Sequence, residues 1–250
     1  MQGRYQTADQ ALVREMNLSI ILRYLHAGGP MSRASLASLA GLNKTTVSSL
    51  VDELCRRGLV HDVGMDNTRT GRPATLLELN PDAGLIAGVA LGVDFVSVIL
   101  ADFVGQIRWR RREAADPRES QEDMIRRTQE LVDEAIRFGR DASRRLLGLG
   151  IATPGTVDVD RGLLIFSPNL QWHDVAYRDI FNARTGLPVL VDNDANAAAQ
   201  AEHLFGVARQ AQNFLSVFGG VGVGGGLFLN GTLYRGAAGF AGETGPPTIV

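Results

Sequence analysis

The sequence predicts an α/β protein with two domains, a small helical one over residues 1–80 and a larger one over residues 81–250 in which strands and helices alternate. Helical periodicity of apolar residues dominates the first 60 residues, whereas short apolar runs typical of strands alternate with helical segments after residue 84. Residues 1–80 hold nine Lys and Arg against seven Asp and Glu, a net charge of +2. Residues 81–250 hold sixteen against twenty, a net charge of −4. A dense glycine run at 219–226 falls in the second domain.

The overall composition excludes several classes of protein. The 250 residues are 45% hydrophobic and 21% charged, as in an ordinary globular core, and the net charge of −2 gives no overall basic field. Cys55 is the single cysteine, which excludes an intramolecular disulfide framework and a multi-cysteine zinc site. No apolar run approaches the roughly 20 residues of a membrane span, and the N-terminus lacks the apolar core of a signal peptide. We therefore expect a cytoplasmic protein without a membrane partner.

The first domain begins with two predicted helices. Apolar residues between Leu12 and Leu25 recur at a spacing near 3.6, which predicts an amphipathic helix that ends at Gly28-Gly29-Pro30. Ser32 is a suitable N-cap for a short second helix, which Gly41 ends.

A third helix and a hairpin are predicted to follow. Asn43 is a suitable N-cap for this helix, and Gly58 ends it. Its apolar face comprises Val47, Leu50, Val51 and Leu54. The apolar runs LVHDV (59–63) and TLLELN (75–80) then flank a polar loop, which predicts a β-hairpin. Two short helices around a tight glycine-containing turn, followed by such a hairpin, are typical of a winged helix-turn-helix.

The chemistry of this domain fits DNA. The third helix begins with small polar and basic residues that are able to donate to phosphates or to base edges in the major groove. These candidate contacts are Asn43, Lys44, Thr45, Thr46 and Ser48. Arg69 and Arg72 on the predicted wing are suited to the DNA backbone or the minor groove. A three-helix packing domain with a solvated polar face is the alternative, but helix order, turn and wing occur together within about 70 residues, so we expect binding to operator DNA.

The second domain shows the pattern of an α/β sheet. Strands are predicted within 84–113, over 146–155, at the start of 189–206, and on both sides of the glycine run in 213–231. A charged helix is predicted from Ser120 to Arg145. Its inward-facing residues are expected to be Ile125, Leu131, Val132, Ile136 and Phe138. Loops at the strand ends are available for ligands.

Several motifs in this domain occur in a characteristic order. They are ATPGTVD (152–158), SPNLQW (167–172), NDANAAA (193–199), GVGGGLFLNGTLYRG (222–236) and AGETG (241–245). Through them the chain, from about residue 15 to residue 250, resembles the ROK family of repressors and sugar kinases. The resemblance implies an actin/hexokinase-like (ribonuclease H-like) α/β fold for residues 81–250, with the second lobe incomplete. The helix-turn-helix followed by GRPATLLELN (71–80) resembles the arm found in the family's regulators.

The resemblance also implies a sugar site. Residue by residue, that site maps onto Asn169, Asn193, Asp194 and Glu243, with Gly155 near the edge of the sugar. Carboxylates and amides at strand ends are able to pair with several hydroxyl groups, and such a site rejects analogues that lack them. In the family's kinases the residue matching Asp194 is the general base for the attacked sugar hydroxyl. Taken alone, the acid and amide in this motif are also typical of a helix N-cap with its first-turn acids.

The phosphate and metal elements of the kinases are altered. Where the kinases carry Asp-x-Gly-Gly-Thr, this chain has Ala90-Leu91-Gly92-Val93-Asp94, without the acid, one glycine and the hydroxyl. Val221 replaces the threonine of the second phosphate motif, and Pro246 stands where the family's first zinc ligand is expected. We therefore expect neither ATP nor a metal, and no cofactor.

Together these inferences predict a sugar-responsive DNA-binding transcriptional regulator, a repressor, whose sugar-binding domain is not catalytic. We expect a homo-oligomer, a dimer or tetramer, in which a bound sugar or sugar derivative changes the relative placement of two winged helices. The alternatives are an active ROK-type ATP-dependent sugar kinase with a DNA-binding arm, and a product with no ligand response. The altered phosphate loop argues against the kinase.

Overall fold

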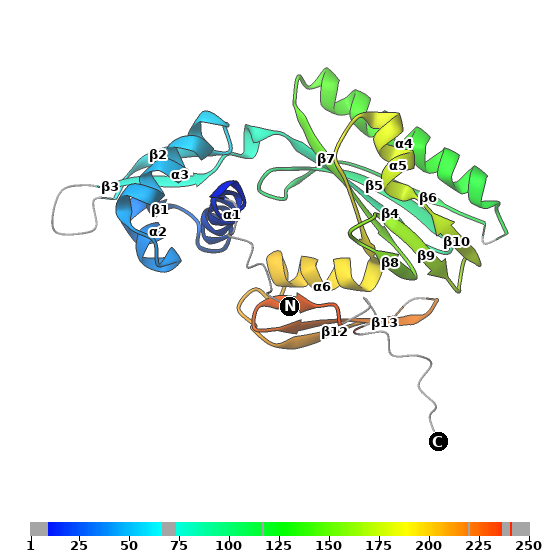
Figure 1. Ribbon diagram of the computed structural model, residues 1–250. Helices are drawn as coiled ribbons and strands as arrows, with labels where there is room; N and C mark the ends of the chain where they lie inside the picture. Colours follow the sequence, from blue (N-terminus) through cyan, green and yellow to red (C-terminus); the bar gives the residue numbers. More distant parts are fainter. Residues whose placement is uncertain (1–9, 67–73, 117, 220, 237–240, 242–250) are drawn as a thin grey trace, which may run out of the picture. The chain divides into compact units, whose positions relative to one another are not determined.

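The computed structural model describes residues 10–66, 74–116, 118–219, 221–236 and 241 (Figure 1). The chain divides into two compact units, Met1–Ala83 and Gly84–Val250. Within the described ranges, no helix is long and apolar enough to cross a membrane.

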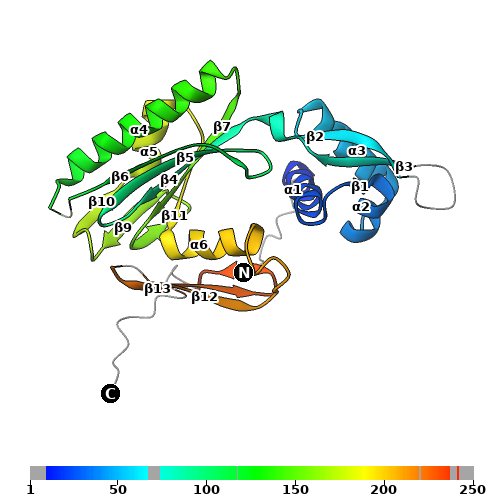
Figure 2. The same cartoon turned by 180° about the vertical axis from the view of Figure 1, so that it is seen from behind.

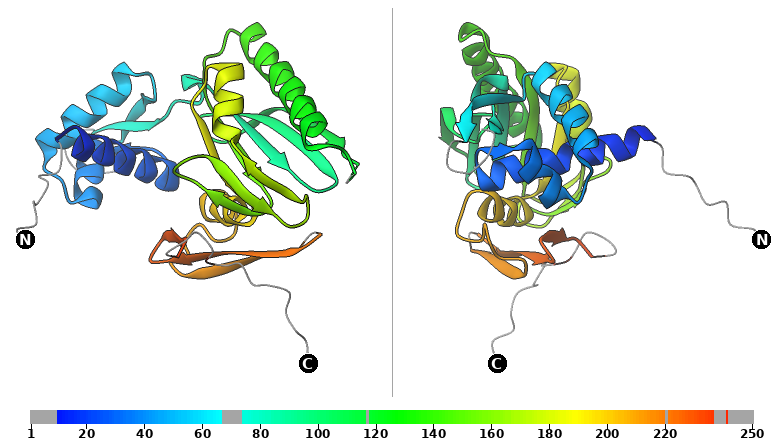
Figure 3. Two further views of the ribbon diagram at one scale, coloured as in Figure 1. Left: turned by 45° about the vertical axis from the view of Figure 1, so that its right-hand side comes forward. Right: turned by 90° about the vertical axis from the view of Figure 1, so that its left-hand side faces the viewer.

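The first unit consists of three helices and a small antiparallel sheet (Figure 3). The helices are α1 (Gln10–Gly28), α2 (Arg33–Ala40) and α3 (Lys44–Arg56), and the strands are β1 (Met31–Ser32), β2 (Val60–Asp66) and β3 (Ala74–Leu79). The sheet order is β1-β3-β2, so β2 and β3 form the predicted hairpin. The two-residue strand β1 was not predicted, and its pairing with β3 ties the start of α2 to the hairpin.

Both predicted N-caps of this unit are confirmed. Ser32 Oγ accepts from the backbone N–H of Ser35 at 3.1 Å, and Asn43 Oδ1 accepts from that of Thr46 at 2.7 Å. Each bond satisfies a donor that the helix N-terminus leaves without an intrahelical partner. The face of α3 predicted to be apolar is buried, as are Leu18, Ile21 and Leu25 of α1, Leu36 of α2 and Leu77 of β3.

The second unit is built on a mixed five-stranded sheet in the order β11-β7-β4-β5-β6. Its strands are β4 (Leu85–Leu91), β5 (Phe95–Asp102), β6 (Ile107–Ala114), β7 (Leu146–Thr153) and β11 (Val189–Asn193). Strands β4, β7 and β11 run parallel, and β5 and β6 complete the sheet as antiparallel neighbours. Because parallel strands end at the same edge of a sheet, the turns that follow β4 and β7 lie at one edge with the end of β11.

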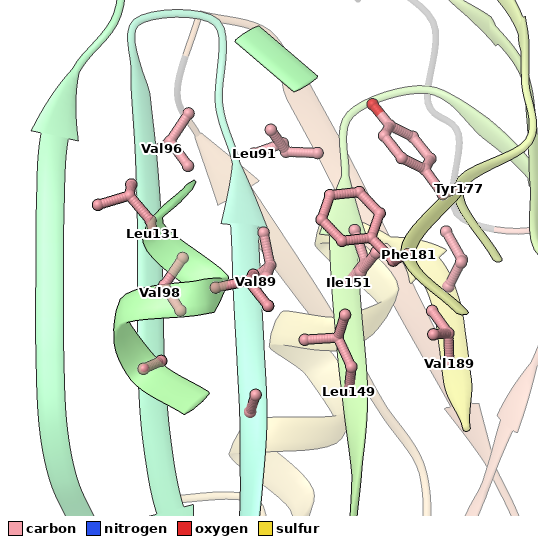
Figure 4. Close-up of a cluster of buried hydrophobic side chains, with 14 of the residues drawn as sticks. Val89, Leu91, Val96, Val98, Leu131, Leu149, Ile151, Tyr177, Phe181 and Val189 are labelled. Carbon is pink, nitrogen blue, oxygen red and sulfur yellow. The ribbon is translucent and has the colours of Figure 1, made fainter. Parts of the chain in front are cut away.

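Helices α4 (Gln121–Asp141) and α5 (Tyr177–Thr185) cover one face of this sheet (Figures 1 and 2). Figure 4 shows Val98 of β5 and Ile151 of β7 in the same buried cluster as Leu131 of α4 and Phe181 of α5. This cluster is the core of the second unit, and α5 was not predicted from the sequence.

The prediction for the inward face of α4 is wrong at one position. Phe138 is 41% exposed, whereas Leu131, Val132 and Ile136 are buried as expected. Residues two apart on a helix point in nearly opposite directions, so Ile136 and Phe138 do not both face the sheet.

Two smaller sheets and one helix complete the second unit. The first sheet comprises β8 (Thr156–Asp158), β9 (Leu163–Ser167) and β10 (Trp172–Val175) and was not predicted. The second comprises β12 (Phe214–Gly219), β13 (Val223–Leu229) and the unpredicted β14 (Thr232–Tyr234). Helix α6 (Asp194–Leu204) packs against β12 and β13 (Figure 2). Glycines of β13 permit this contact, because a methyl group on Gly226 would lie 2.4 Å from Ala199 Cβ.

Candidate functional site

Asn193 joins two strand ends at the edge of the five-stranded sheet. It is the last residue of β11 and the N-cap of α6, and its Oδ1 accepts from the backbone N–H of Asn196 at 3.0 Å. Its Nδ2 donates to the carbonyl oxygen of Gly155 at 3.0 Å, in the turn after β7. Both polar atoms of the side chain therefore bond within the chain, and they fix the turn after β7 to the start of α6.

Gly155 occupies a position that only glycine fits. Its φ angle is +115°, a conformation that other residues rarely adopt. A methyl group there would lie 2.3 Å from the carbonyl oxygen of Phe166 and 2.8 Å from Ser167 Cα. This close approach brings the turn after β7 against the end of β9.

Asp194 lies at the first position of α6 and is half-buried. Burial raises the pKa of its carboxyl above the usual value, although the carboxylate accepts from the backbone N–H of Ala195 at 2.9 Å. A helix N-terminus favours a negative charge at this place, whereas removal from water disfavours it. The result is a hydrogen-bond acceptor held at the sheet edge, with a perturbed pKa of the kind that functional sites often contain.

Asn169 approaches the same region from the exposed loop between β9 and β10. A methyl group on Gly222 would lie 3.2 Å from Asn169 Nδ2. Two residues further along the chain, a methyl group on Gly224 would lie 2.9 Å from Ala195 Cβ, next to Asp194.

The structure thus brings four of the five predicted sugar-site residues, Gly155, Asn169, Asn193 and Asp194, to the region around the N-terminus of α6. Glu243, the fifth, lies outside the described residues.

The turn between β4 and β5, which the resemblance predicts to match the first phosphate motif of the kinases, contains the ring of Phe95. A methyl group on Gly92 would lie 2.3 Å from Cε1 of Phe95, so the ring lies directly on this glycine. The guanidinium carbon of Arg112 lies 3.9 Å from the centroid of the same ring. The backbone N–H of Gly92 donates to the carbonyl oxygen of Phe95 at 2.8 Å. The turn therefore directs this donor at protein rather than at a ligand, and neither Phe95 nor Arg112 was singled out from the sequence.

The predicted DNA-binding residues lie at the start of α3. Asn43, Lys44 and Thr45 are exposed, and Thr46 and Ser48 are half-buried. Arg69 and Arg72, predicted on the wing, lie outside the described residues.

Side chains that were not predicted as functional hold α3 in place. Arg33 donates to the carbonyl oxygen of Ser48 at 3.0 Å and pairs with Asp52 at 2.7 Å. Arg14 of α1 donates through Nε to Glu53 at 2.7 Å, and hydrogen bonds from Arg14 and Arg57 hold the pKa of the Glu53 carboxyl below its usual value. Contacts from α1 and α2 therefore fix the position of α3 and of its exposed face.

The described part of the chain contains no group of three or more His, Cys, Asp and Glu side chains arranged to hold a metal ion.

Comparison with known proteins relates both units to established families. Residues 19–66 match a family described as MarR, and residues 86–249 match the ROK family. The xylose repressor of Caldicellulosiruptor bescii is 35% identical over 241 residues, which are 96% of this chain and 60% of the relative. The chain therefore spans about 60% of the length of this curated relative.

Solved structures agree with these matches. A ROK family transcriptional regulator, a homologue of the Escherichia coli MLC protein, superposes with a TM-score of 0.80 at 26% identity and covers 95% of this chain and 60% of that one. A ROK family glucokinase from Streptomyces griseus, solved with glucose and AMPPNP, superposes with a TM-score of 0.58 at 32% identity. It covers 67% of this chain and 51% of the glucokinase. The match to the ROK family extends over residues 86–249, which is more than half of this chain. The chain therefore belongs to the ROK family.

Proposed function

We propose that this chain is the DNA-binding and sugar-sensing part of a cytoplasmic transcriptional repressor. One observation carries the proposal: a winged helix-turn-helix is joined to a ROK domain in the same chain. The candidate sugar-site residues in the sequence, and the ring of Phe95 on Gly92 in the turn predicted to match the phosphate motif, support it. The similarity to the xylose repressor of Caldicellulosiruptor bescii over almost the whole chain supports it.

Operator DNA is the proposed partner of the first unit. Lys44 and Thr45 are exposed at the start of α3, where a recognition helix meets the major groove. Asn43, Thr46 and Ser48 would contribute from the same turn, and Arg69 and Arg72 from the wing. The cation of Lys44 would meet a phosphate, which positions the helix without reading sequence.

A pentose, with D-xylose as the first candidate, is the proposed effector of the second unit. Asp194 and Asn169 would pair with its hydroxyl groups, together with Glu243, and Asn193 and Gly155 would shape the edge of the site. Asp194 is half-buried and Asn169 is exposed, so polar groups of both side chains are accessible at this sheet edge, and a few polar groups placed together favour a polar ligand. Asp194 would act here as a hydrogen-bond acceptor with no proton transfer to follow.

The proposed domain is a sensor and not a kinase. Phosphoryl transfer depends on groups that position and neutralise phosphate. In this chain the ring of Phe95 lies on Gly92, and the carboxylate of Asp94 would repel phosphate.

Repression would be relieved through an oligomer, a dimer or tetramer. A sugar acts only through a difference in affinity between two arrangements of the protein. We propose that the sugar-bound arrangement separates or rotates paired winged helices away from the spacing of the two operator half-sites.

The test is DNA binding with and without sugar. Fluorescence anisotropy compares a labelled fragment from upstream of the chain's own gene with a scrambled fragment, in the presence of D-xylose, D-glucose or neither. We expect preference for the upstream fragment and release by D-xylose. Equal affinity for both fragments would overturn the DNA-binding proposal, and specific binding that neither sugar changes would overturn the sensing proposal.

A further inference from the structure

Arg235 and Asp192 form a two-bonded ion pair. Nη1 of Arg235 donates to Oδ1 of Asp192 at 2.7 Å, and Nη2 donates to Oδ2 at 2.6 Å. The two side chains are 33% and 18% exposed, whereas the two in the Arg126–Asp123 pair of α4 are 63% and 53% exposed. A partly buried pair with two parallel bonds fixes both distance and orientation, which a solvated pair does not.

Asp192 lies directly before the proposed sugar contacts. Its Oδ1 also accepts from the backbone N–H of Asn193 at 2.8 Å, and its Oδ2 accepts from Gln200 of α6 at 3.4 Å. The carboxylate therefore links β11, the start of α6 and, through Arg235, the chain that leaves β14.

Arg235 is tied at its own backbone as well. Its carbonyl oxygen accepts from the backbone N–H of Ala241 at 3.2 Å. One residue thus connects the segment after β14 with the junction between β11 and α6, 43 positions earlier in the chain.

We infer that Arg235 is a positioning residue for the sugar site, holding Asp192 so that the backbone at Asn193 and Asp194 keeps the geometry a sugar requires. This inference rests on the proposed function above. Removing one partner of such a pair leaves a carboxylate without its counter-charge, and the strand end that carries it then relaxes. Binding sites lose affinity when supporting contacts allow the residues that touch the ligand to shift by fractions of an ångström.

Four variants distinguish a positioning role of Arg235 in the sugar site from a contribution to the overall stability of the second unit. Arg235→Met removes the charge and both bonds, Arg235→Lys keeps the charge, and Asp192→Asn is made alone and together with Arg235→Met. The matched control is Arg184→Met, which breaks the pair of Arg184 with Asp133 at 2.7 Å, between α5 and α4. The readouts are the dissociation constant of D-xylose by calorimetry, the melting temperature, and amide hydrogen exchange of residues 192–196.

We expect Arg235→Met to weaken D-xylose binding by about tenfold, by analogy with metal sites, where removing the groups that orient the ligating side chains costs at least that much affinity. Arg235→Lys should recover part of this loss, and the double variant should bind no worse than Arg235→Met, because both changes remove the same interaction. Exchange at residues 192–196 should become faster in Arg235→Met and stay unchanged in Arg184→Met.

Three results would each overturn the inference: D-xylose affinity in Arg235→Met equal to that of the parent, unchanged exchange at residues 192–196 in Arg235→Met, or a loss of affinity in the double variant that equals the sum of the two single losses. Binding of no sugar by the parent would instead refute the sensing proposal, and the exchange measurement alone would then decide whether Arg235 holds the junction.

Discussion

Asn193 Nδ2 and the carbonyl oxygen of Gly155, 38 positions apart in the chain, lie 3.0 Å from one another. This bond connects the ends of two parallel strands, and the same side chain caps α6 through its oxygen. The geometry of the proposed sugar site therefore depends on one amide that need not touch the sugar. Substitutions of Asn193 are therefore expected to disturb both the turn after β7 and the start of α6.

Asn193→Ala should destabilise the second unit by about 2–3 kcal/mol, because it removes a helix cap and leaves the Gly155 carbonyl unpaired. Asn43→Ala removes only a cap, in the first unit, and should cost about 1 kcal/mol. Both tryptophans, Trp109 and Trp172, belong to the second unit, so their fluorescence in urea reports that unit alone, whereas far-ultraviolet circular dichroism reports both. Equal losses in the two variants would contradict the role of the bond to Gly155.

Gly155→Ala should destabilise the second unit by about 2 kcal/mol or more, since it adds a methyl group 2.3 Å from the Phe166 carbonyl oxygen in a backbone with positive φ. Gly150→Ala is the matched control in β7. A methyl group there meets no atom within 4 Å, so its effect should stay within about 1 kcal/mol. The urea midpoints of Gly155→Ala and Gly150→Ala test whether the turn at Gly155 requires glycine. Equal midpoints in the two variants would show that this turn moves to accommodate the methyl group.

Local signals predicted most of the first unit. The caps Ser32 and Asn43 and the apolar period of α3 act within a few residues, so the sequence alone contains them. Strand β1 was missed because it is two residues long and exists only through its pairing with β3.

In the second unit, what was missed depends on tertiary contacts. Helix α5 begins at Tyr177 after Ala176, which makes no side-chain cap, and its stability comes from burying Tyr177 and Phe181. The candidate sugar residues remain a prediction from motifs, whereas the contacts made by Arg235 and Phe95 could not be predicted from local sequence. Each joins positions whose proximity the fold alone determines.

Asp194→Asn should stabilise the sugar-free protein at neutral pH. Burial raises the pKa of Asp194 above 3.8, so between that value and the folded-state pKa the native state binds more protons than the unfolded state. The free energy of unfolding therefore rises as pH falls through this window, and the ionised carboxylate destabilises the fold above it. Asparagine retains an acceptor for the N–H of Ala195 and carries no charge.

Urea unfolding at about pH 7 and about pH 4 measures this effect, and the advantage of Asp194→Asn should shrink at the lower pH. Asp192→Asn is the matched control and should act in the opposite direction at neutral pH, because it loses the ion pair with Arg235. A destabilised Asp194→Asn at pH 7 would mean that the ionised carboxylate is stabilised by contacts within the chain.

Lys44→Ala should weaken DNA binding and reduce the slope of log K against log salt by about one, because one phosphate contact is lost. Arg56→Ala is the control, since it removes a cation from the opposite end of α3, roughly 18 Å along the helix. Anisotropy titrations at several salt concentrations give the slopes. An unchanged slope in Lys44→Ala would remove this residue from the interface.

The purified chain should show no transfer of phosphate from magnesium-ATP to D-xylose or D-glucose in a coupled assay. The ring of Phe95 lies on Gly92, Arg112 lies over that ring, and the N–H of Gly92 bonds to the chain itself. Phe95→Ala would remove the ring from the turn but leave Val93 and Asp94, so this variant should also lack kinase activity. Only a variant that also restores the kinase residues of this loop is expected to gain affinity for phosphate. The same assay on the Streptomyces griseus glucokinase shows that turnover is detectable. Because kinases of this chemistry turn over about 1–100 times per second, a rate near 1 per second in the parent would show that phosphate is held elsewhere in the chain and would favour the kinase.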